Sequence, residues 1–191
     1  NRVIIGVTAL GGCRRDIPDT LQPPIRAGLD AVERGLAGIA PFVLGNEAVA
    51  RRLAGVGVIP RQVALDLGLV GPTTRASGVA VDVRRSGYAA HDELPVEPVV
   101  ETGGDALART VVRWREIGES MRLCREALDR LHRLPGPLAT RVPPVLHGEA
   151  TSRVEAPRGE LFYYVLADGE PHPTRVRVRT PTFANLAAVL S

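Results

Sequence analysis

Hydrophobic positions repeat with the period of a helix over two long stretches of the chain, residues 21–45 and residues 105–134. In the first stretch the apolar residues are spaced four or three apart: Ile25, Leu29, Val32, Leu36, Ile39 and Val43. A similar stripe in the second stretch includes Trp114. This spacing is typical of a helix that packs along another helix. We therefore expect two long helices, roughly antiparallel, that share a core containing Leu36 and Trp114.

Proline and glycine mark the ends of these helices. Pro41 falls inside the first stripe and should kink or end that helix nearby. A second, short helix is expected from Glu47 to about Leu53, before the glycine-rich stretch 55–60. Residues 135–137, Pro-Gly-Pro, should stop the longest helix. Its polar face carries opposite charges four residues apart, which indicates a solvated face.

Beyond residue 143 the period changes from that of a helix to that of a strand. Residues 161–166 are aromatic and aliphatic, residues 167–171 form a turn signal, and residues 174–180 alternate arginine with valine between two threonines. This pattern predicts a β-hairpin with one apolar face and one arginine face. The middle region, 68–104, is rich in glycine and proline and predicts ordered loops with short strands.

These elements indicate an α+β fold, with long packed helices and a small antiparallel β region near the C-terminus. We expect a single domain in which residues 1–142 form a helical core with ordered loops. Residues 143–191 would add a hairpin-containing segment to the same domain. The composition, 45% hydrophobic and 24% charged, is that of a globular protein.

Charge and hydropathy exclude two classes of partner. The longest nearly apolar runs, 3–13 and 36–45, are well short of the ~18 residues that span a bilayer, so we expect no direct membrane span. All 24 basic residues are arginines, but the net charge is only +3 because acids are interspersed among them. Without a basic patch, a nucleic-acid partner is not expected.

The residues also lack the local patterns of a cofactor site. The glycines at 55–57 and 71–78 do not complete a phosphate-binding motif. The four histidines and the two cysteines, Cys13 and Cys124, never occur at metal-ligand spacing. We therefore expect this chain, as given, to bind no nickel, iron or flavin. From composition and spacing alone it is a soluble α+β module without a self-contained catalytic centre.

Several segments nevertheless resemble, in the same order, the motifs of one family. They are GGCRRD at 11–16, GVGVI at 55–59, GP and RASGV within 71–79, Tyr88 with DEL at 92–94, EAPRGE at 155–160, and VRVRTPTFANL at 176–186. They are similar to motifs of the large subunits of energy-converting nickel–iron hydrogenases. With small changes, they also mark the hydrogenase-like subunit of respiratory complex I. His91 stands where the family usually has tyrosine.

The resemblance implies a hydrogenase-large-subunit-like core and also shows what the chain lacks. Members of the hydrogenase branch bind nickel and iron through two CxxC pairs, one near each terminus, because soft thiolates suit these metals. This chain has neither pair. Our hypothesis is that one pair precedes Asn1 and the other follows Ser191. The nickel–iron centre would then belong to the full-length parent, whereas a homologue of the complex I type would lack it.

By the same resemblance, Arg158 lies over the reacting centre and Pro157 shapes the pocket beside it. A guanidinium is permanently charged and presents a rigid fork of donors, so it can orient and stabilise developing charge. Glu155 and Glu160 are expected to pair with Arg158 or with nearby arginines. We thus take Arg158, Pro157 and Glu155 as the candidate catalytic residues. The alternative is that residues 157–159 are simply a turn before the Leu161 strand.

Three functions remain open at this point. The favoured hypothesis is a core fragment of a nickel–iron hydrogenase large subunit. The second is the quinone-chamber subunit of an NADH–quinone oxidoreductase, beside an iron–sulfur cluster of a partner. The third is a non-catalytic scaffold. In the first two, the resemblance implies an iron–sulfur small subunit and membrane subunits as partners, at the cytoplasmic face of the membrane. The isolated chain is expected to be inactive and to expose apolar surface.

Overall fold

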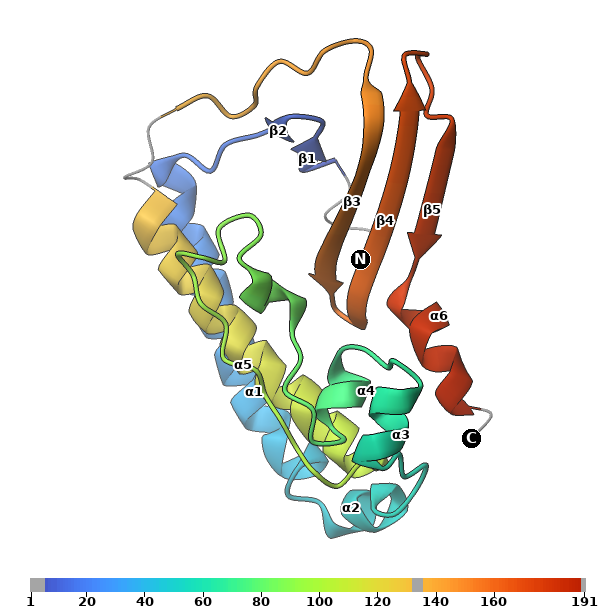
Figure 1. The fold of residues 1–191 in the computed structure, drawn as a ribbon. Coiled ribbons are helices and arrows are strands. Elements are labelled where there is room, and N and C mark those ends of the chain that lie inside the picture. The colour runs from blue at the N-terminus through green and yellow to red at the C-terminus, as the bar shows by residue number, and fades with distance from the viewer. Residues whose placement is uncertain (1–5, 132–135, 190–191) are drawn as a thin grey trace.

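The computed structural model describes residues 6–131 and 136–189, which form a helical body and a sheet that extends from it (Figure 1). The α-helices are α1 (Gln22–Val43), α2 (Glu47–Leu53), α3 (Arg61–Asp66), α4 (Pro72–Arg75), α5 (Ala106–Leu131) and α6 (Pro181–Asn185). The strands are β1 (Thr8–Ala9), β2 (Gly12–Cys13), β3 (His147–Ala156), β4 (Gly159–Asp168) and β5 (Arg175–Arg179). Short 3-10 helices lie at Asp19–Leu21, Val83–Ser86 and Leu186–Val189. The predicted α+β fold class is confirmed.

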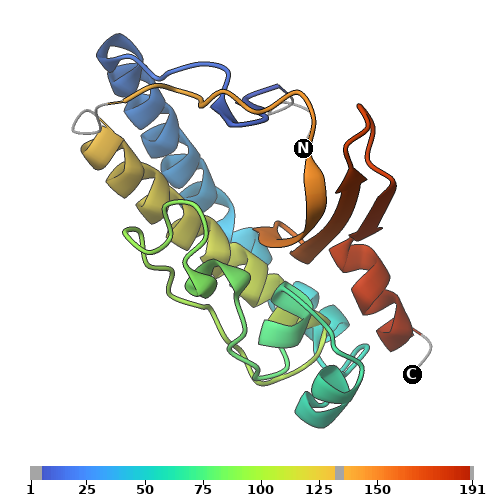
Figure 2. The ribbon, with the colours of Figure 1, turned by 45° about the horizontal axis from the view of Figure 1, so that its top comes forward.

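The two long helices lie side by side and antiparallel, as the hydrophobic stripes predicted (Figures 1 and 2). Ion pairs near one end fix their register. Arg125 of α5 contacts Asp30 at 2.9 Å and Glu33 at 2.6 Å on α1. The expected shared core is shallower than predicted, because Leu36 and Trp114 are both only half-buried. No residue of α1 is fully buried, so one side of this helix pair faces solvent.

The ends predicted for the first two helices agree with the structure. The helix α1 continues past Pro41 and ends at Val43, two residues later. The short helix α2 has the predicted bounds, and Asn46 caps it by accepting hydrogen bonds from the backbone N–H groups of Ala48 and Val49 at 2.9 and 3.3 Å. Such a cap satisfies donors that the first turn leaves unpaired. For α5, residues 132–134 of the predicted helix lie outside the described residues.

The middle region contains no strand among its residues 68–104, which corrects the prediction of short strands there. Instead it forms α4, a 3-10 turn and ordered loops that pack on α5. Proline fits the first turn of a helix, where its missing N–H is not needed, and Pro72 opens α4 in this way. Ala76 packs with Ala108 and Val112 of α5 in a core where Ala76 and Val112 are fully buried. The region is therefore part of the helical body.

The strands β3, β4 and β5 form one antiparallel sheet in that order. The predicted hairpin is confirmed as β4–β5, with Val178 opposite Tyr163 and Arg177 opposite Tyr164. Its arginine face and its valine face are both exposed along β5. Sequence analysis missed β3, whose residues 147–153 are all exposed. The sheet is thus attached to the body mainly at the end where β3 turns into β4.

The molecule exposes more surface than a compact protein of its mass. Its accessible area is 12,860 Å², whereas a compact monomer of 20.4 kDa exposes about 8,800 Å². Exposed apolar residues include Phe42, Val176, Val178 and Phe183, which are 47–75% accessible. Within the described residues, no helix is both long and apolar enough to span a membrane. A considerable part of the apolar surface is therefore accessible to solvent in this chain.

The exposed valine face of β5 should drive self-association of the isolated chain. We expect sedimentation to detect oligomers that dissociate on dilution, because Val176 and Val178 are about half exposed on an edge strand with no outer neighbour among the described strands. The double variant Val176→Glu/Val178→Glu should shift the chain to monomer. The control, Arg177→Glu on the opposite face, should leave association unchanged. A wild-type chain that stays monomeric at every concentration would contradict this prediction.

Candidate functional site

The turn that joins β3 to β4 consists of Pro157 and Arg158 and is held by backbone contacts. Gly159 packs against Gly71, the residue that precedes α4. A Cβ atom on Gly71 would collide with the Gly159 Cα and would lie 2.5 Å from the Arg158 carbonyl oxygen. Both glycines also have positive φ angles, +70° and +126°. The turn can therefore sit this close only because neither residue carries a side chain.

A side chain from α6 fixes the other side of this junction. The Asn185 amide accepts a hydrogen bond from the Val70 N–H at 2.9 Å and donates one to the Val70 carbonyl at 3.1 Å. These two hydrogen bonds satisfy both backbone groups of Val70, as a neighbouring β-strand would. The junction thus brings α4, the β3–β4 turn and α6 together, and it gives the turn a fixed position beside the helical body (Figure 1).

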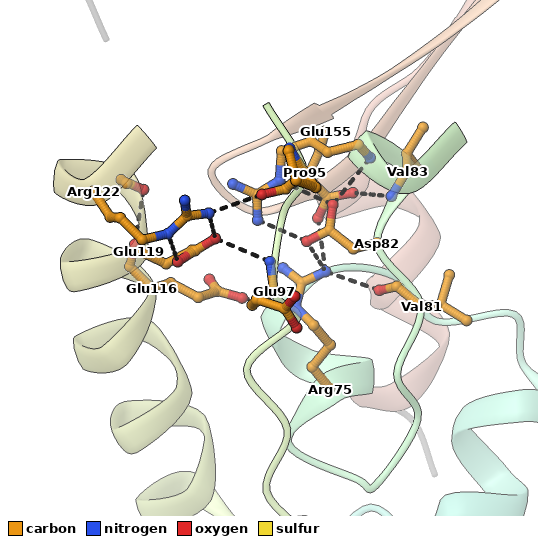
Figure 3. A network of polar contacts seen from close by, with 12 residues as sticks. Arg75, Val81, Asp82, Val83, Pro95, Glu97, Glu116, Glu119, Arg122 and Glu155 are labelled. Atoms are coloured by element: carbon orange, nitrogen blue, oxygen red, sulfur yellow. Dashed lines mark hydrogen bonds and ion pairs between the residues drawn. The ribbon is translucent and has the colours of Figure 1, made fainter. Parts of the chain in front are cut away.

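Directly behind the turn lies a buried arginine, Arg75, whose side chain is 1% exposed. Its Nε donates to Glu116 of α5 at 2.7 Å, and its Nη1 donates to Glu155 of β3 at 3.0 Å. Nη1 also donates to the Val81 carbonyl at 2.9 Å and lies 3.3 Å from an Asp82 oxygen. Figure 3 shows these side chains converging on the guanidinium from separate elements. A buried guanidinium needs several such partners to offset its lost hydration.

Asp82 is a buried carboxyl of this group that favours its ionised form. It is fully buried, and Arg84 donates to both of its oxygens at 2.9 and 2.6 Å. Burial by itself favours the neutral acid, but the hydrogen bonds from Arg84 and the charge of Arg75 outweigh it. Together they hold the pKa of Asp82 below its ordinary value.

Glu155 has the opposite tendency. Its side chain is 5% exposed, and its second oxygen accepts a hydrogen bond from the Val83 N–H at 3.2 Å. Burial raises the pKa of Glu155 above its ordinary value, and the nearby negative charge of Asp82 acts in the same direction, while Arg75 opposes both. The backbone N–H of Glu155 donates to the Tyr88 hydroxyl at 2.9 Å, which holds this end of β3 in place.

A cavity of about 490 Å³ opens beside this cluster. Its polar lining comes from α4, α5, the 3-10 turn and the end of β3. The lining includes Arg75, Arg84, Arg113, Glu116, Glu155 and Pro157. A cavity of this size holds several water molecules or a small ligand. Its walls bring guanidinium and carboxyl groups together next to the tip of the β3–β4 turn.

The structure brings two of the three sequence-predicted site residues to this cavity. Glu155 and Pro157 line it, whereas Arg158 is exposed at the tip of the turn and is not part of the lining. Within the described part of the chain, the Arg158 side chain has no hydrogen bond or ion pair. Of the two pairings expected for Glu155, the structure shows the one with a nearby arginine. Glu155 binds Arg75, because the turn directs Glu155 inward and Arg158 outward.

Glu160 is also paired with arginines other than Arg158. It contacts Arg153 of β3 at 3.5 Å and forms an ion pair with Arg179 of β5, so it stabilises the sheet. This agrees with the expectation of a nearby arginine as its partner. The guanidinium of Arg158 thus remains available to contact a group outside the described residues.

Sequence reasoning missed the residues that organise the site. Arg75 belongs to the RASG motif, to which the sequence alone assigns no role, and Asp82 follows it by seven residues. Glu116 lies on the charged face of α5, for which the pattern predicts full solvation, yet its side chain is only 16% exposed. The one signal in the sequence is that RASGV is among the segments that resemble the family.

A second ionic group fastens the loop after the site to α5. Arg122 binds Glu119 through two hydrogen bonds of 2.7 and 2.8 Å and donates to the Pro95 carbonyl at 2.8 Å. Glu119 in turn accepts from the Glu97 N–H at 2.9 Å. Figure 3 shows this group next to the Arg75 cluster. It closes the loop of residues 95–97 over α5.

The described residues do not form a donor set for nickel and iron. No cluster of three or more histidine, cysteine, aspartate or glutamate side chains suited to a metal occurs in residues 6–131 and 136–189. The two cysteines, Cys13 and Cys124, are both exposed, and neither is in a disulfide. The thiolate ligands that such a centre needs are therefore not supplied by this part of the molecule.

Replacing Arg75 should destabilise the fold strongly. In Arg75→Met the apolar chain keeps most of the volume but leaves buried carboxylates without their counter-charge, so we expect a loss of about 3–5 kcal/mol in the free energy of unfolding. Denaturant titration of the chain measures this loss. The matched control is Arg122→Met, because Arg122 also binds two carboxylates but is 43% exposed. The control should lose about 1 kcal/mol or less, and equal losses would argue against the cluster as a structural centre.

The glycine contact at the turn can be tested separately. Gly71→Ala should cost more stability than Gly68→Ala, although both residues have positive φ angles, +70° and +60°. Only Gly71 has backbone within 4 Å of the added Cβ, whereas nothing lies that close to Gly68. The Gly68→Ala variant thus measures the backbone strain alone, about 1–2 kcal/mol. Equal melting temperatures for the two variants would show that the turn does not need this contact.

Known proteins of one family match this chain over nearly its whole length. The family described as respiratory-chain NADH dehydrogenase, 49 kDa subunit, matches residues 1–147 and 137–191. A carbon monoxide-induced hydrogenase of Rhodospirillum rubrum is 38% identical, over 99% of this chain and 53% of its own length. A subunit of the NADH-quinone oxidoreductase of Deinococcus radiodurans is 35% identical, over 96% of this chain and 53% of its own length.

Solved structures lead to the same family. A chain in the membrane-bound sulfane sulfur reductase, an archaeal respiratory membrane complex, superposes with a TM-score of 0.87 at 36% identity. The match covers 96% of this chain and 52% of that one. The chain thus spans about half the length of the relatives it matches. The resemblance predicted from the motifs is confirmed: this chain belongs to the family of the 49 kDa subunit of the respiratory-chain NADH dehydrogenase.

Proposed function

We propose that this chain forms the core of the large subunit of a membrane-associated oxidoreductase complex of the nickel–iron hydrogenase type. The observation that carries the proposal is the tip of the β3–β4 turn. There a guanidinium without a partner among the described residues, that of Arg158, is presented on a backbone that Gly71 and Gly159 hold against the helical body. The 38% identity to a carbon monoxide-induced hydrogenase, over 99% of the chain, supports the same assignment.

The role of Arg158 in this proposal is electrostatic. Arginine stays charged at any physiological pH, and its planar fork presents several N–H donors in fixed directions. A donor that is already in place costs no reorganisation when charge develops at the reacting centre. The rigid turn supplies this preorganisation, since its position depends on backbone contacts and not on the Arg158 side chain. Pro157 contributes by restricting the backbone of the turn.

The metal and the partners come from outside the described residues in this proposal. A nickel–iron centre would supply the chemistry of hydrogen oxidation and proton reduction, and its thiolate ligands would lie outside these 191 residues. An iron–sulfur small subunit would exchange electrons with it, and membrane subunits would hold the complex at the cytoplasmic face. The exposed apolar residues described above are the surface that such partners would cover. The 191 residues alone would show no hydrogen uptake.

A second candidate is the quinone-chamber subunit of an NADH-quinone oxidoreductase. The family match and the 35% identity to the Deinococcus radiodurans subunit favour it. In that case Arg158 would face a quinone instead of a metal. A polypeptide that carries this chain between two CxxC motifs would support the hydrogenase proposal, and one without them would favour the quinone or the scaffold alternative.

Substitution of Arg158 in the complete complex tests the proposal. In Arg158→Lys the charge remains but the planar fork is lost, so hydrogen turnover should fall about 10²–10³-fold. Metal content and melting temperature should stay at wild-type values, because Arg158 makes no side-chain hydrogen bond or ion pair within the described residues that its loss would break. Dye-linked hydrogen uptake, metal analysis and thermal unfolding on one preparation measure the three quantities.

The control is Arg52→Lys, an exposed arginine in the last turn of α2, which should keep full turnover. A folded, metal-replete Arg158→Lys complex with wild-type turnover would rule out the electrostatic role. Wild-type quinone reduction without hydrogen activity would replace the hydrogenase proposal by the quinone alternative. Loss of stability in parallel with activity would favour a purely structural turn.

A further inference from the structure

The buried cluster behind the turn contains more carboxyl groups than guanidinium groups. Asp82, Glu116 and Glu155 surround Arg75 and Arg84, so with all five groups ionised the cluster carries one excess negative charge. The side chains of Asp82 and Glu155 are 0% and 5% exposed. An excess charge is costly in such surroundings, and a bound proton removes it. One proton on any of the three carboxyl groups would make the cluster neutral.

Of the three carboxyl groups, Glu155 has the longest contact with its nearest guanidinium, 3.0 Å, against 2.6 Å for Asp82 and 2.7 Å for Glu116. Asp82 receives two hydrogen bonds from Arg84 and stays ionised. Glu116 accepts from the Nε of Arg75 at 2.7 Å and is the most exposed of the three. Glu155 instead shares Nη1 of Arg75 with the Val81 carbonyl and with Asp82, and its second oxygen accepts only the longer, uncharged hydrogen bond from the Val83 N–H at 3.2 Å.

Other charged groups near Glu155 do not change this comparison. Glu160 lies directly opposite Glu155 in the β3–β4 register, but it is neutralised by Arg153 and Arg179. Arg113 of α5 lines the cavity and is exposed, and its side chain donates a hydrogen bond to the Arg109 carbonyl. The Tyr88 hydroxyl accepts from the backbone N–H of Glu155 and so does not neutralise its carboxyl group.

We propose that Glu155 is a proton-exchange site that connects the cavity of about 490 Å³ with the reacting centre beside the Arg158 turn. This inference rests on the proposed function, because oxidation of hydrogen releases protons and reduction of a quinone consumes them. Glu155 is placed to accept protons released by the first reaction or to supply protons consumed by the second. It lines the cavity, and it lies three residues before Arg158 on the strand that leads into the turn.

The step is a proton transfer without a redox change at Glu155. When a proton arrives from the reacting centre, an O–H bond forms at the carboxylate, and it breaks again as the proton passes to water in the cavity. The electrons leave separately, to the oxidised iron–sulfur partner of the proposed complex. Glu116 and Ser120 also line the cavity and offer oxygen atoms along the exit. Proton transfer requires such groups within hydrogen-bond reach or one water apart.

Infrared difference spectroscopy of the intact complex tests the site without relying on turnover. A pH step on the wild-type complex should reveal the C=O band of a protonated carboxyl, shifted in heavy water. Glu155→Gln, which keeps the size and the hydrogen-bond acceptor, should abolish this band. The matched control is Glu149→Gln on the exposed part of the same strand, and it should retain the band. A band that persists in Glu155→Gln and disappears in Glu116→Gln would overturn the assignment.

Turnover provides the second measurement. Glu155→Gln should lower hydrogen turnover about 10²-fold or more and remove one ionisation from its pH profile, whereas Glu155→Asp should restore part of the rate. Glu149→Gln should behave as wild type. A folded Glu155→Gln complex with wild-type turnover and pH profile would refute the proton-exchange role. If the wild-type complex instead shows neither hydrogen nor quinone activity, the proposed function fails, while the infrared band still reports whether Glu155 binds the proton.

Discussion

The burial of Arg75 is the constraint on which the rest of the structure depends. Its guanidinium joins α4, the segment of residues 81–82, α5 and the end of β3, which are distant in sequence. A buried cation is tolerated only while these partners stay in place. The charge therefore selects one arrangement of the four elements and excludes looser ones. The same interactions set the position of the turn that carries Arg158, so folding and the geometry of the candidate site are not separable here.

The long strands β3 and β4 contact the helical body mainly near the turn that joins them. Near the turn, Gly159 and Glu160 are buried, whereas β3 is exposed over its first seven residues. The turn end is thus anchored by Gly71 and Arg75, and the far end extends away from the helices (Figures 1 and 2). The accessible area of 12,860 Å² reflects this extended end, where most of the sheet residues remain in contact with solvent.

The helices and strands that could be predicted from the sequence are those with a regular repeat of hydrophobic positions. The long helices carry an apolar stripe along the side on which they meet, and β5 alternates arginine with valine, so these elements leave a repeating pattern in the sequence. The strand β3 gives no such pattern because residues 147–153 are solvated on both faces. The helices α3 and α4 have only six and four residues, too few for a repeat to be recognised. No sequence pattern shows which of 24 arginines is buried, because burial of Arg75 results from contacts made across the whole chain.

The backbone contact between Gly71 and Gly159 also determines how the β3–β4 turn responds to substitutions at its tip. A loop fixed by its own side chains loses its position when those side chains change. Here the turn is held by the Gly71–Gly159 backbone contact and by Glu155, which binds Arg75, whereas the side chain at the tip makes no hydrogen bond or ion pair with the described residues. The side chain at the tip can therefore be changed without moving the backbone that carries it, so the length and charge of the tip are adjustable independently of the fold.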